Sequence, residues 1–199
     1  MVRRILRVFT EPIRGLHQAA YLLAFFSLLS QILGLVRDRA FAHMFGAGPV
    51  LDAYFAAFKV PDLVFALLTL FVSSFALVPL LSGRDAKGQG VLVGNVLVAF
   101  GAVAITASAA LWFAMPSLIP VLFPGFDKAT TDDIVLLSRI MLAQPVLLGL
   151  SSIAASVIHV LRRFLVYAVA PIFYNVGIII GIVFLYPSMG VAGLAWGVV

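Results

Sequence analysis

The sequence contains no cysteine, a single glutamate and few charged residues of either sign. Without thiols there can be no disulfide bond and no thiolate metal site. Charged residues make up 11% of the 199 residues and hydrophobic residues 63%, whereas soluble domains have about 25% and about 45–50%. A soluble fold of this size could not hide so much apolar surface. The composition excludes an ordinary cytosolic enzyme and a disordered chain, and leaves a polytopic membrane protein.

Motifs that carry chemistry are also missing. The three histidines are scattered, and none stands in a metal-ligand spacing. The chain has no nucleophile–base pair, no glycine loop for phosphates and no paired carboxylates, so we expect neither catalysis nor a cofactor. The net charge of +5 could suggest nucleic acid, but the basic residues lie in short loops between apolar runs. That placement is typical of membrane orientation, and we expect no nucleic-acid partner.

Long apolar runs are what the sequence does contain. Because these runs are continuous, they predict membrane-spanning helices and not the alternating strands of an outer-membrane barrel. The predicted fold class is therefore all-α, a polytopic transmembrane helix bundle in a lipid bilayer. The expected full spans cover about residues 16–45, 51–81, 91–115, 133–161 and 164–186.

Glycine and proline mark the expected breaks between these spans. Residues 46–49 separate the first span from the second, and 82–90 form the next loop. The prolines within 116–125 are expected to end the third span, and 187–190 the fifth. A sixth apolar run, 190–199, covers only about half of the roughly 20 residues that a crossing needs. We therefore expect the chain to be a fragment of a longer, transporter-like protein.

The basic residues predict the orientation. They precede the first span, occupy the 82–90 loop and follow the fourth span as Arg162-Arg163, so these segments are expected on the cytoplasmic side. The 116–132 loop is then outside. Within residues 1–15 arginines alternate with apolar residues, which predicts an amphipathic helix on the inner membrane surface. A simple orientation signal is the alternative interpretation of that segment.

Polar residues inside two spans share a helical face. Because such residues are costly in a membrane, they usually face a cavity or a partner. Two striped helices joined by a short turn should pack near each other and line a wet space. The first stripe comprises Ser27, Ser30, Gln31, Gly34, Arg37 and Asp38, and the second comprises Asp52, Lys59, Asp62, Thr69 and Ser73.

Structural interpretations of the same residues stay open. Arg37 and Asp38 could lie at the outer interface and snorkel, and Lys59 could pair with Asp52 or Asp62. Arg139, about two turns from the outer end of the fourth span, is expected to snorkel as well. Two small-xxx-small pairs, Gly177/Gly181 and Gly193/Gly197, are expected to let helices approach closely.

The most specific pattern lies between residues 30 and 62. It reads SQILGLVRDR at 30–39, FGAG at 45–48 and LDAYFAAFKVPD at 51–62. This block resembles the opening of the MurJ (MviN) family, the lipid II flippases of bacterial cell-wall synthesis. Later matches extend the resemblance over nearly the whole chain: Val78-Pro79, FPGF at 123–126, Ala170-Pro171 with Asn175, and LAWG at 194–197.

The resemblance implies a fold and a function. The family belongs to a superfamily with the MATE exporters, so the chain is similar to the first part of a transporter's N-terminal lobe. It implies an inner-membrane flippase that moves lipid II, an undecaprenyl-pyrophosphate-linked disaccharide peptide, to the outer leaflet by alternating access. Sodium or the membrane potential could drive it. Proteins of cell-wall synthesis are candidate partners.

The resemblance also implies a substrate site. Arg37 and Asp38 match the family's cavity arginine–aspartate pair, and Asp52 matches a required acidic residue. A guanidinium fork suits pyrophosphate oxygens. With the rest of the two stripes, the expected substrate-binding residues are Arg37, Asp38, Asp52, Lys59, Ser30 and Gln31.

The chain departs from the family pattern in two places. Gln31 stands where many members carry a basic residue, and residues 65–70 replace a basic and Glu-Gly pattern. Either Lys59 compensates, or the substrate differs. The alternatives are a MATE-like cation-coupled exporter, a polysaccharide-unit flippase and a non-transporting membrane scaffold.

Overall fold

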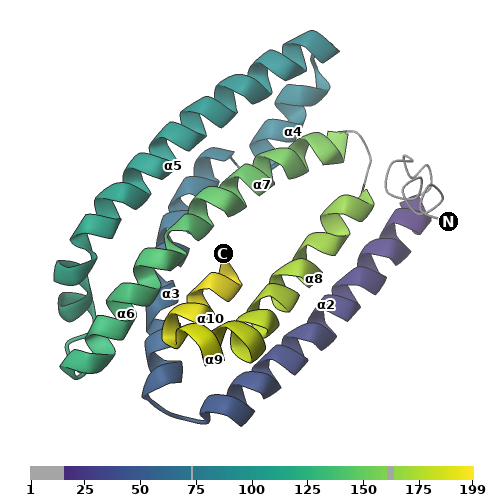
Figure 1. Cartoon of the computed structure of the whole chain (residues 1–199). Helices are drawn as coiled ribbons and strands as arrows, with labels where there is room; N and C mark the ends of the chain where they lie inside the picture. The colour runs from purple at the N-terminus through teal and green to yellow at the C-terminus, as the bar shows by residue number, and fades with distance from the viewer. Residues whose placement is uncertain (1–15, 73, 161–163) are drawn as a thin grey trace.

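The computed structural model describes residues 16–72, 74–160 and 164–199, and within these ranges every regular element is a helix (Figure 1). The predicted all-α class is therefore confirmed. The predicted amphipathic segment 1–15 and Arg162-Arg163 lie outside the described residues. The elements are α2 (Leu16–Phe45), α3 (Pro49–Val72), α4 (Ser74–Ser82), α5 (Ala86–Leu122), α6 (Lys128–Met141), α7 (Ala143–Val160), α8 (Phe164–Ile180), the π-helical η1 (Gly181–Leu185), α9 (Tyr186–Met189) and α10 (Val191–Val198).

Five stretches of helix in the described residues are long and apolar enough to cross a membrane. The chain is therefore a multi-pass membrane protein. The first predicted span coincides with α2, whereas α3 and α4 together occupy the second. The fourth begins earlier than predicted, at Lys128, and is interrupted at Leu142, between α6 and α7. There Pro145 lacks the N–H that would have bonded the carbonyl of residue 141.

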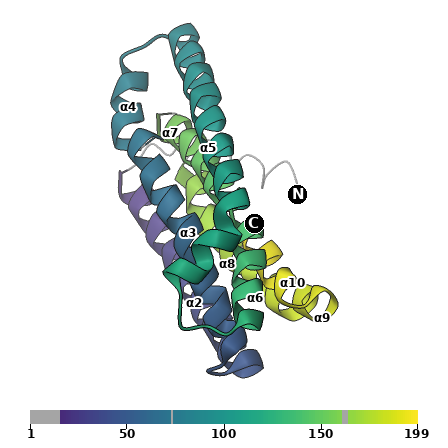
Figure 2. The ribbon, with the colours of Figure 1, turned by 90° about the vertical axis from the view of Figure 1, so that its left-hand side faces the viewer.

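The helices form two groups, which contact each other through α7 and α8, through α2 and α3, and through the short α10 (Figures 1 and 2). In one group α2 lies along α8. In the other, α3 and α5 pack against α6 and α7, and α4 packs against α7. The short α10 bridges the groups, because it contacts η1 and α8 on one side and α6 on the other. Outside its contact with α8, α2 stays largely uncovered within the described chain.

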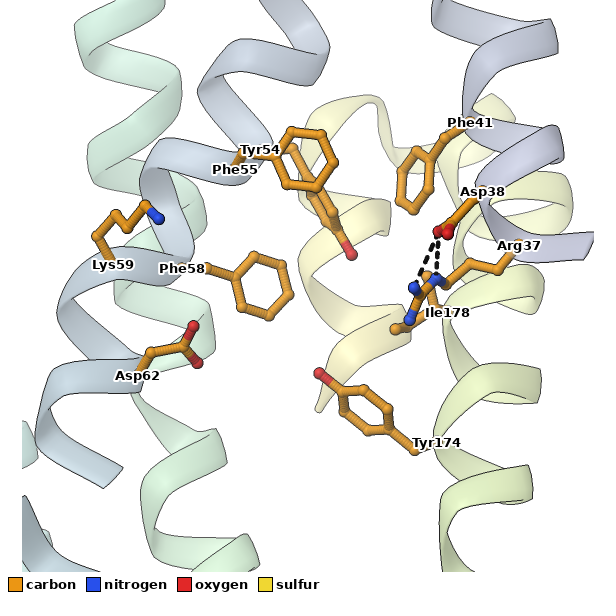
Figure 3. Close-up of a pocket in the computed structure, with 10 residues that line it drawn as sticks. All are labelled: Arg37, Asp38, Phe41, Tyr54, Phe55, Phe58, Lys59, Asp62, Tyr174 and Ile178. Atoms are coloured by element: carbon orange, nitrogen blue, oxygen red, sulfur yellow. Dashed lines mark hydrogen bonds and ion pairs between the residues drawn. The ribbon is translucent and has the colours of Figure 1, made fainter. Parts of the chain in front are cut away.

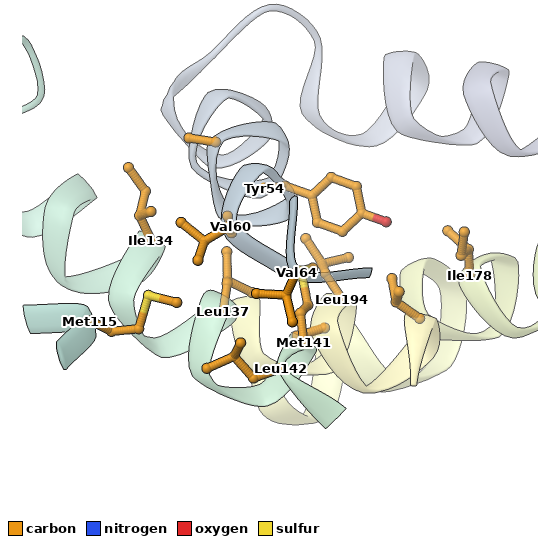
Figure 4. Packing of buried hydrophobic residues seen from close by; sticks show 14 of the residues in the cluster. Tyr54, Val60, Val64, Met115, Ile134, Leu137, Met141, Leu142, Ile178 and Leu194 are labelled. Carbon is orange, nitrogen blue, oxygen red and sulfur yellow. The ribbon is translucent and has the colours of Figure 1, made fainter. Parts of the chain in front are cut away.

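A cluster of buried hydrophobic side chains lies where α3, α5, α6 and α10 converge (Figure 4). Met115, Ile134, Leu137 and Met141 have no exposed surface there. Ser138 is also fully buried, and its hydroxyl donates to the Ala57 carbonyl of α3 at 3.1 Å. This core fixes the start of α3, which carries one wall of the site described below.

Helix α5 contradicts the prediction that the third span ends at its prolines. It begins at Ala86, inside the expected 82–90 loop, and continues through Pro116 and Pro120 to Leu122. Pro116 cannot donate to the Trp112 carbonyl one turn earlier. The Nε of Arg139, on α6, donates to that carbonyl at 2.9 Å, and its guanidinium lies 4.3 Å from the centre of the Trp112 ring. Arg139 thus replaces the bond that Pro116 removes.

Aspartate side chains cap the N-termini of α5 and α6. Asp127 precedes α6 and accepts from the Thr130 N–H at 3.3 Å. Hydrogen bonding from Thr130 lowers the pKa of the Asp127 carboxyl below its ordinary value. Asp85 caps α5 in the same way, accepting from the Gly88 N–H at 3.0 Å. These caps satisfy N–H groups that the first turn of a helix leaves free.

Four glycines hold η1 and α8 against α10, as the small-xxx-small spacing predicts. A Cβ placed on Gly197 would lie 2.6 Å from the Gly181 Cα and 2.9 Å from the Gly177 carbonyl oxygen. A Cβ on Gly193 would meet the Leu185 backbone. The fifth span runs beyond the predicted residue 186 to Met189 and ends at Gly190, whose φ is +61°. A side chain would be strained at that angle.

Candidate functional site

A cavity of about 360 Å³ lies between α2, α3 and α8, near the connection that joins α2 to α3 (Figure 3). Its volume is at the lower end of the range for ligand pockets, about 300–1,000 Å³. Charged and aromatic side chains share its walls. The lining residues are Arg37, Asp38, Phe41, Tyr54, Phe55, Phe58, Lys59, Asp62, Tyr174 and Ile178.

Arg37, on α2, is held from two directions. Its Nε and Nη2 both lie 2.9 Å from the same carboxylate oxygen of Asp38, and its Nη1 donates to the Asn175 amide oxygen at 3.0 Å. These contacts use three guanidinium N–H groups and leave the others free for a ligand. The Arg37 side chain is 28% exposed and that of Asp38 is 63% exposed. The arginine is therefore fixed in place and still accessible.

Asn175 ties this arginine to the neighbouring helix. It is buried on α8, and its Nδ2 donates to the Ser30 carbonyl at 3.2 Å, the Ser30 hydroxyl at 3.1 Å and the Pro171 carbonyl at 3.1 Å. Because the amide nitrogen faces these acceptors, the amide oxygen must face Arg37. A Cβ on Gly34 would lie 3.9 Å from that oxygen, so α2 passes close to Asn175 here.

Aromatic side chains from α2, α3 and α8 line the rest of the cavity. Tyr54 is buried on α3, and its ring centre lies 4.7 Å from that of Phe41 and 5.0 Å from that of Phe58. The hydroxyls of Tyr54 and Tyr174 point into the space between the helices (Figure 3). The Gln144 side-chain amide donates to the Tyr174 hydroxyl at 3.4 Å. The cavity thus combines hydroxyl groups and ring faces with the Arg37 cation.

The cavity brings together three of the six predicted site residues. Arg37, Asp38 and Lys59 line it. Ser30 lies behind it and is linked to Arg37 through Asn175. Gln31 and Asp52 are exposed, on α2 and in the first turn of α3, and neither lines the cavity.

The alternative ion pair of Lys59 with Asp52 or Asp62 does not form in the structure. Among the described residues, Arg37–Asp38 is the ion pair that is present. Lys59 and Asp62 are both exposed and both border the cavity. Lys59 is therefore a second cation available to a ligand.

Sequence reasoning missed Tyr54, Phe58 and Tyr174 as lining residues. Aromatic residues inside an apolar run look like core or lipid-facing residues, so no local signal marks them. Asn175 did carry a signal, because an amide within a membrane helix requires a partner. In the described part of the chain no cluster of three histidine, aspartate or glutamate side chains could hold a metal ion.

This arrangement suits an anionic, polar ligand. Guanidinium N–H groups form charge-assisted bonds to phosphate or carboxylate oxygens, often two at a time. Lys59 adds a positive charge on the facing helix, and the aromatic wall provides flat apolar surface. The carboxylates of Asp38 and Asp62 balance the two cations in formal charge and can accept bonds from ligand hydroxyls, so an anion is bound by the free donors of Arg37 and Lys59 and not by an excess of positive charge.

Comparisons with known proteins agree with one another. The model of a family described as "Lipid II flippase MurJ" matches residues 41–199. A protein of that name from Burkholderia cenocepacia is 30% identical over 198 residues, which cover 93% of this chain and 37% of that protein. A protein of the same name from Thermosipho africanus is 31% identical over 157 residues, which cover 78% of this chain and 33% of that protein.

A solved structure shows the same architecture. It is titled "Lipid II flippase MurJ, inward closed conformation" and is 29% identical in sequence. The superposition has a TM-score of 0.75 and covers 89% of this chain and 38% of the solved one. The chain therefore spans about a third of the length of the relatives that it matches.

Proposed function

This chain belongs to the MurJ family of lipid II flippases, and from that membership we propose that it forms part of a transporter for lipid II. The transporter moves this lipid-linked precursor from the inner to the outer leaflet of the bacterial cytoplasmic membrane. Five apolar spans place the chain in a bilayer, and the activity of the family supplies the substrate. No cofactor and no catalytic group is part of the proposal.

The observation that carries the proposal is the fixed, accessible Arg37. Inserting an arginine at the centre of a membrane helix costs about 2.5–3.5 kcal/mol or more. Snorkelling alone would not require a buried amide to orient the guanidinium. Here Asp38 and Asn175 hold the side chain in the wall of a cavity. We assign it to the pyrophosphate of lipid II.

The other predicted residues have supporting roles in the proposal. Lys59 provides the second cation, since the position of Gln31 is neutral in this chain. Asp38 and Ser30 help to position Arg37, Ser30 acting through Asn175. Asp52 and Gln31 lie outside the cavity and are exposed. They would meet substrate only when the head group enters or leaves.

The proposed mechanism is alternating access. The head group enters from the cytoplasm while the polyprenyl tail stays in lipid, and the transporter then opens to the outside. Sodium or the membrane potential is the proposed driving force. The potential supplies about 2.3 kcal/mol per charge per 100 mV.

Depletion of the protein tests this function. Cells that lose it should retain lipid II in the inner leaflet, so that a reagent confined to the outside labels less lipid II while the total pool rises. The pool should become accessible again when expression is restored. Unchanged outer-leaflet lipid II, together with defective export of a drug or of another lipid-linked sugar, would instead support an exporter or a polysaccharide-unit flippase.

A further inference from the structure

A second cavity, of about 690 Å³, lies between α5 and α6, beside the connection that joins these helices. It shares no lining residue with the Arg37 cavity. Its walls are mixed. Pro116, Pro120 and Leu136 provide apolar surface, Lys128 and Arg139 provide two cations, and Asp132 provides one carboxylate.

Arg139 is fixed in this cavity by α5. Its Nε donates to the Trp112 carbonyl that Pro116 leaves free, and its guanidinium lies over the Trp112 ring. The Nη groups make no hydrogen bond or ion pair to any part of the chain that the structure describes. A half-exposed guanidinium held this way is ready to take a second, anionic partner.

The length of α5 sets the depth of this cavity in the membrane. A helix of 37 residues is about 55 Å long, roughly 25 Å longer than a hydrocarbon core of about 30 Å. If the excess is shared between the two ends, the last 12 Å or so of α5 lie beyond the core. Trp112 is about 15 Å from the end of α5, which puts it near the core boundary. Trp112 is 42% exposed, as expected for an aromatic residue at that level.

We propose that the α5–α6 cavity binds one membrane phospholipid through its phosphodiester group. Arg139 takes the phosphate, Lys128, about 16 Å further along α6 toward the water, attracts it through its charge, and the first part of an acyl chain lies over Pro116, Pro120 and Leu136. Asp132 is placed to accept from the ammonium of an ethanolamine head group, so a zwitterionic lipid is accommodated as well as an anionic one. The proposal depends on the chain crossing a membrane and does not depend on its transporting lipid II.

Photo-crosslinking tests the proposal directly. Phe126 lines the cavity, and Phe113 is 75% exposed and does not line it. Each is replaced in turn by p-benzoylphenylalanine in the purified protein, reconstituted in nanodiscs of phosphatidylglycerol, phosphatidylethanolamine or a phosphate-free galactosyl diacylglycerol. At position 126 both phospholipids should crosslink well and the galactolipid poorly. At position 113 all three should crosslink alike.

Charge variants show whether the phosphate is bound. Lys128→Gln should lower phospholipid crosslinking at position 126 by about twofold, and Lys128→Gln with Arg139→Gln by about fivefold. Lys87→Gln is the matched control, because Lys87 is also an exposed lysine just after an aspartate cap, in the first turn of α5 and outside the cavity. It should change nothing. Since Lys128 is exposed, its variant should fold even if Arg139→Gln loosens α5.

Two results would overturn the proposal. Equal crosslinking of galactolipid and phospholipid at position 126, with no effect of Lys128→Gln, would mean that the cavity holds ordinary boundary lipid. Loss of the crosslink on adding millimolar inorganic phosphate would mean that the cavity binds a free anion and not a lipid.

Discussion

At the scale of single residues, three polar side chains inside apolar helices, those of Arg37, Arg139 and Asn175, have identifiable partners. Arg37 is held by Asp38 and Asn175, and Arg139 by Trp112. The side-chain amide of Asn175 donates its hydrogens to Ser30 on α2 and to the Pro171 carbonyl on α8. Because a polar group without a partner is costly in a membrane, each of these contacts fixes a geometry as well as satisfying a bond.

Asn175 should be required for full transport even though it does not line the cavity. Asn175→Ala removes the acceptor that holds Arg37 and the link to Ser30, and loss of one such partner costs about 1–3 kcal/mol. We expect transport per molecule to fall by roughly tenfold or more at near-normal protein levels. Ser30→Ala leaves the Ser30 carbonyl in place and should have a smaller effect. Wild-type transport per molecule by Asn175→Ala would contradict this positioning role.

The residues of the cavity show what a sequence can indicate at this scale. Arg37 and Lys59 were both found because each repeats at helical spacing with other polar residues of its span. Tyr54 and Tyr174 were missed, because their position in the cavity depends on how α3 and α8 are rotated. That rotation is set by packing between distant segments, which spacing along one helix does not reveal.

At the scale of elements, the differences from prediction arise from contacts distant in sequence. Local rules end a helix at proline, yet α5 continues through Pro116 and Pro120, and Arg139 takes the Trp112 carbonyl, 27 residues earlier in the chain, that Pro116 leaves free. The glycine spacing, by contrast, correctly predicted a close approach of helices, because small residues four apart form a groove on any helix, and the structure shows that α8 and η1 approach α10 there. Helix existence was therefore readable from composition, and so were the ends of the first span, whereas the ends of the third and fourth spans were not.

The α8–α10 contact should tolerate no added methyl group. In Gly197→Ala the new Cβ would press on the backbone of Gly181 and Gly177, which cannot rotate away, and such overpacking costs about 1–3 kcal/mol. We expect a lower thermal midpoint and a lower yield of folded protein in detergent. Gly94→Ala on α5 is the control, since nothing lies within 4 Å of its added Cβ. A Gly197→Ala protein as stable as Gly94→Ala would contradict the close approach.

At the scale of the whole molecule, two helix groups meet around a polar cavity at one end. If residues 1–15 are cytoplasmic, α2 runs outward and the α2–α3 connection lies toward the outside. The cavity beside that connection is then nearer the outer face, with the uncovered length of α2 extending toward the cytoplasm. The five crossings and their order follow from hydropathy. The shape of the cavity between the two groups follows from helix packing and could not be predicted.

Cysteine labelling tests the orientation, because the chain has no cysteine of its own. Lys87→Cys and Ala129→Cys both place an exposed thiol near a helix connection. In intact cells a membrane-impermeant maleimide should label the cysteine at position 129 and leave the cysteine at position 87 unlabelled. Both should react once the membrane has been permeabilised. External labelling at 87 would reverse the proposed topology.

The most direct test of the account is the transport activity of Arg37 variants introduced at the native locus. Outer-leaflet lipid II is measured and divided by the amount of the protein in the membrane. We predict that Arg37→Ala abolishes transport at near-normal abundance. Arg37→Lys should keep part of it, because it keeps the charge and loses the guanidinium fork, and Asp38→Asn should do less harm than Arg37→Ala. Wild-type transport per molecule by Arg37→Ala would contradict the assignment of this cavity to the pyrophosphate.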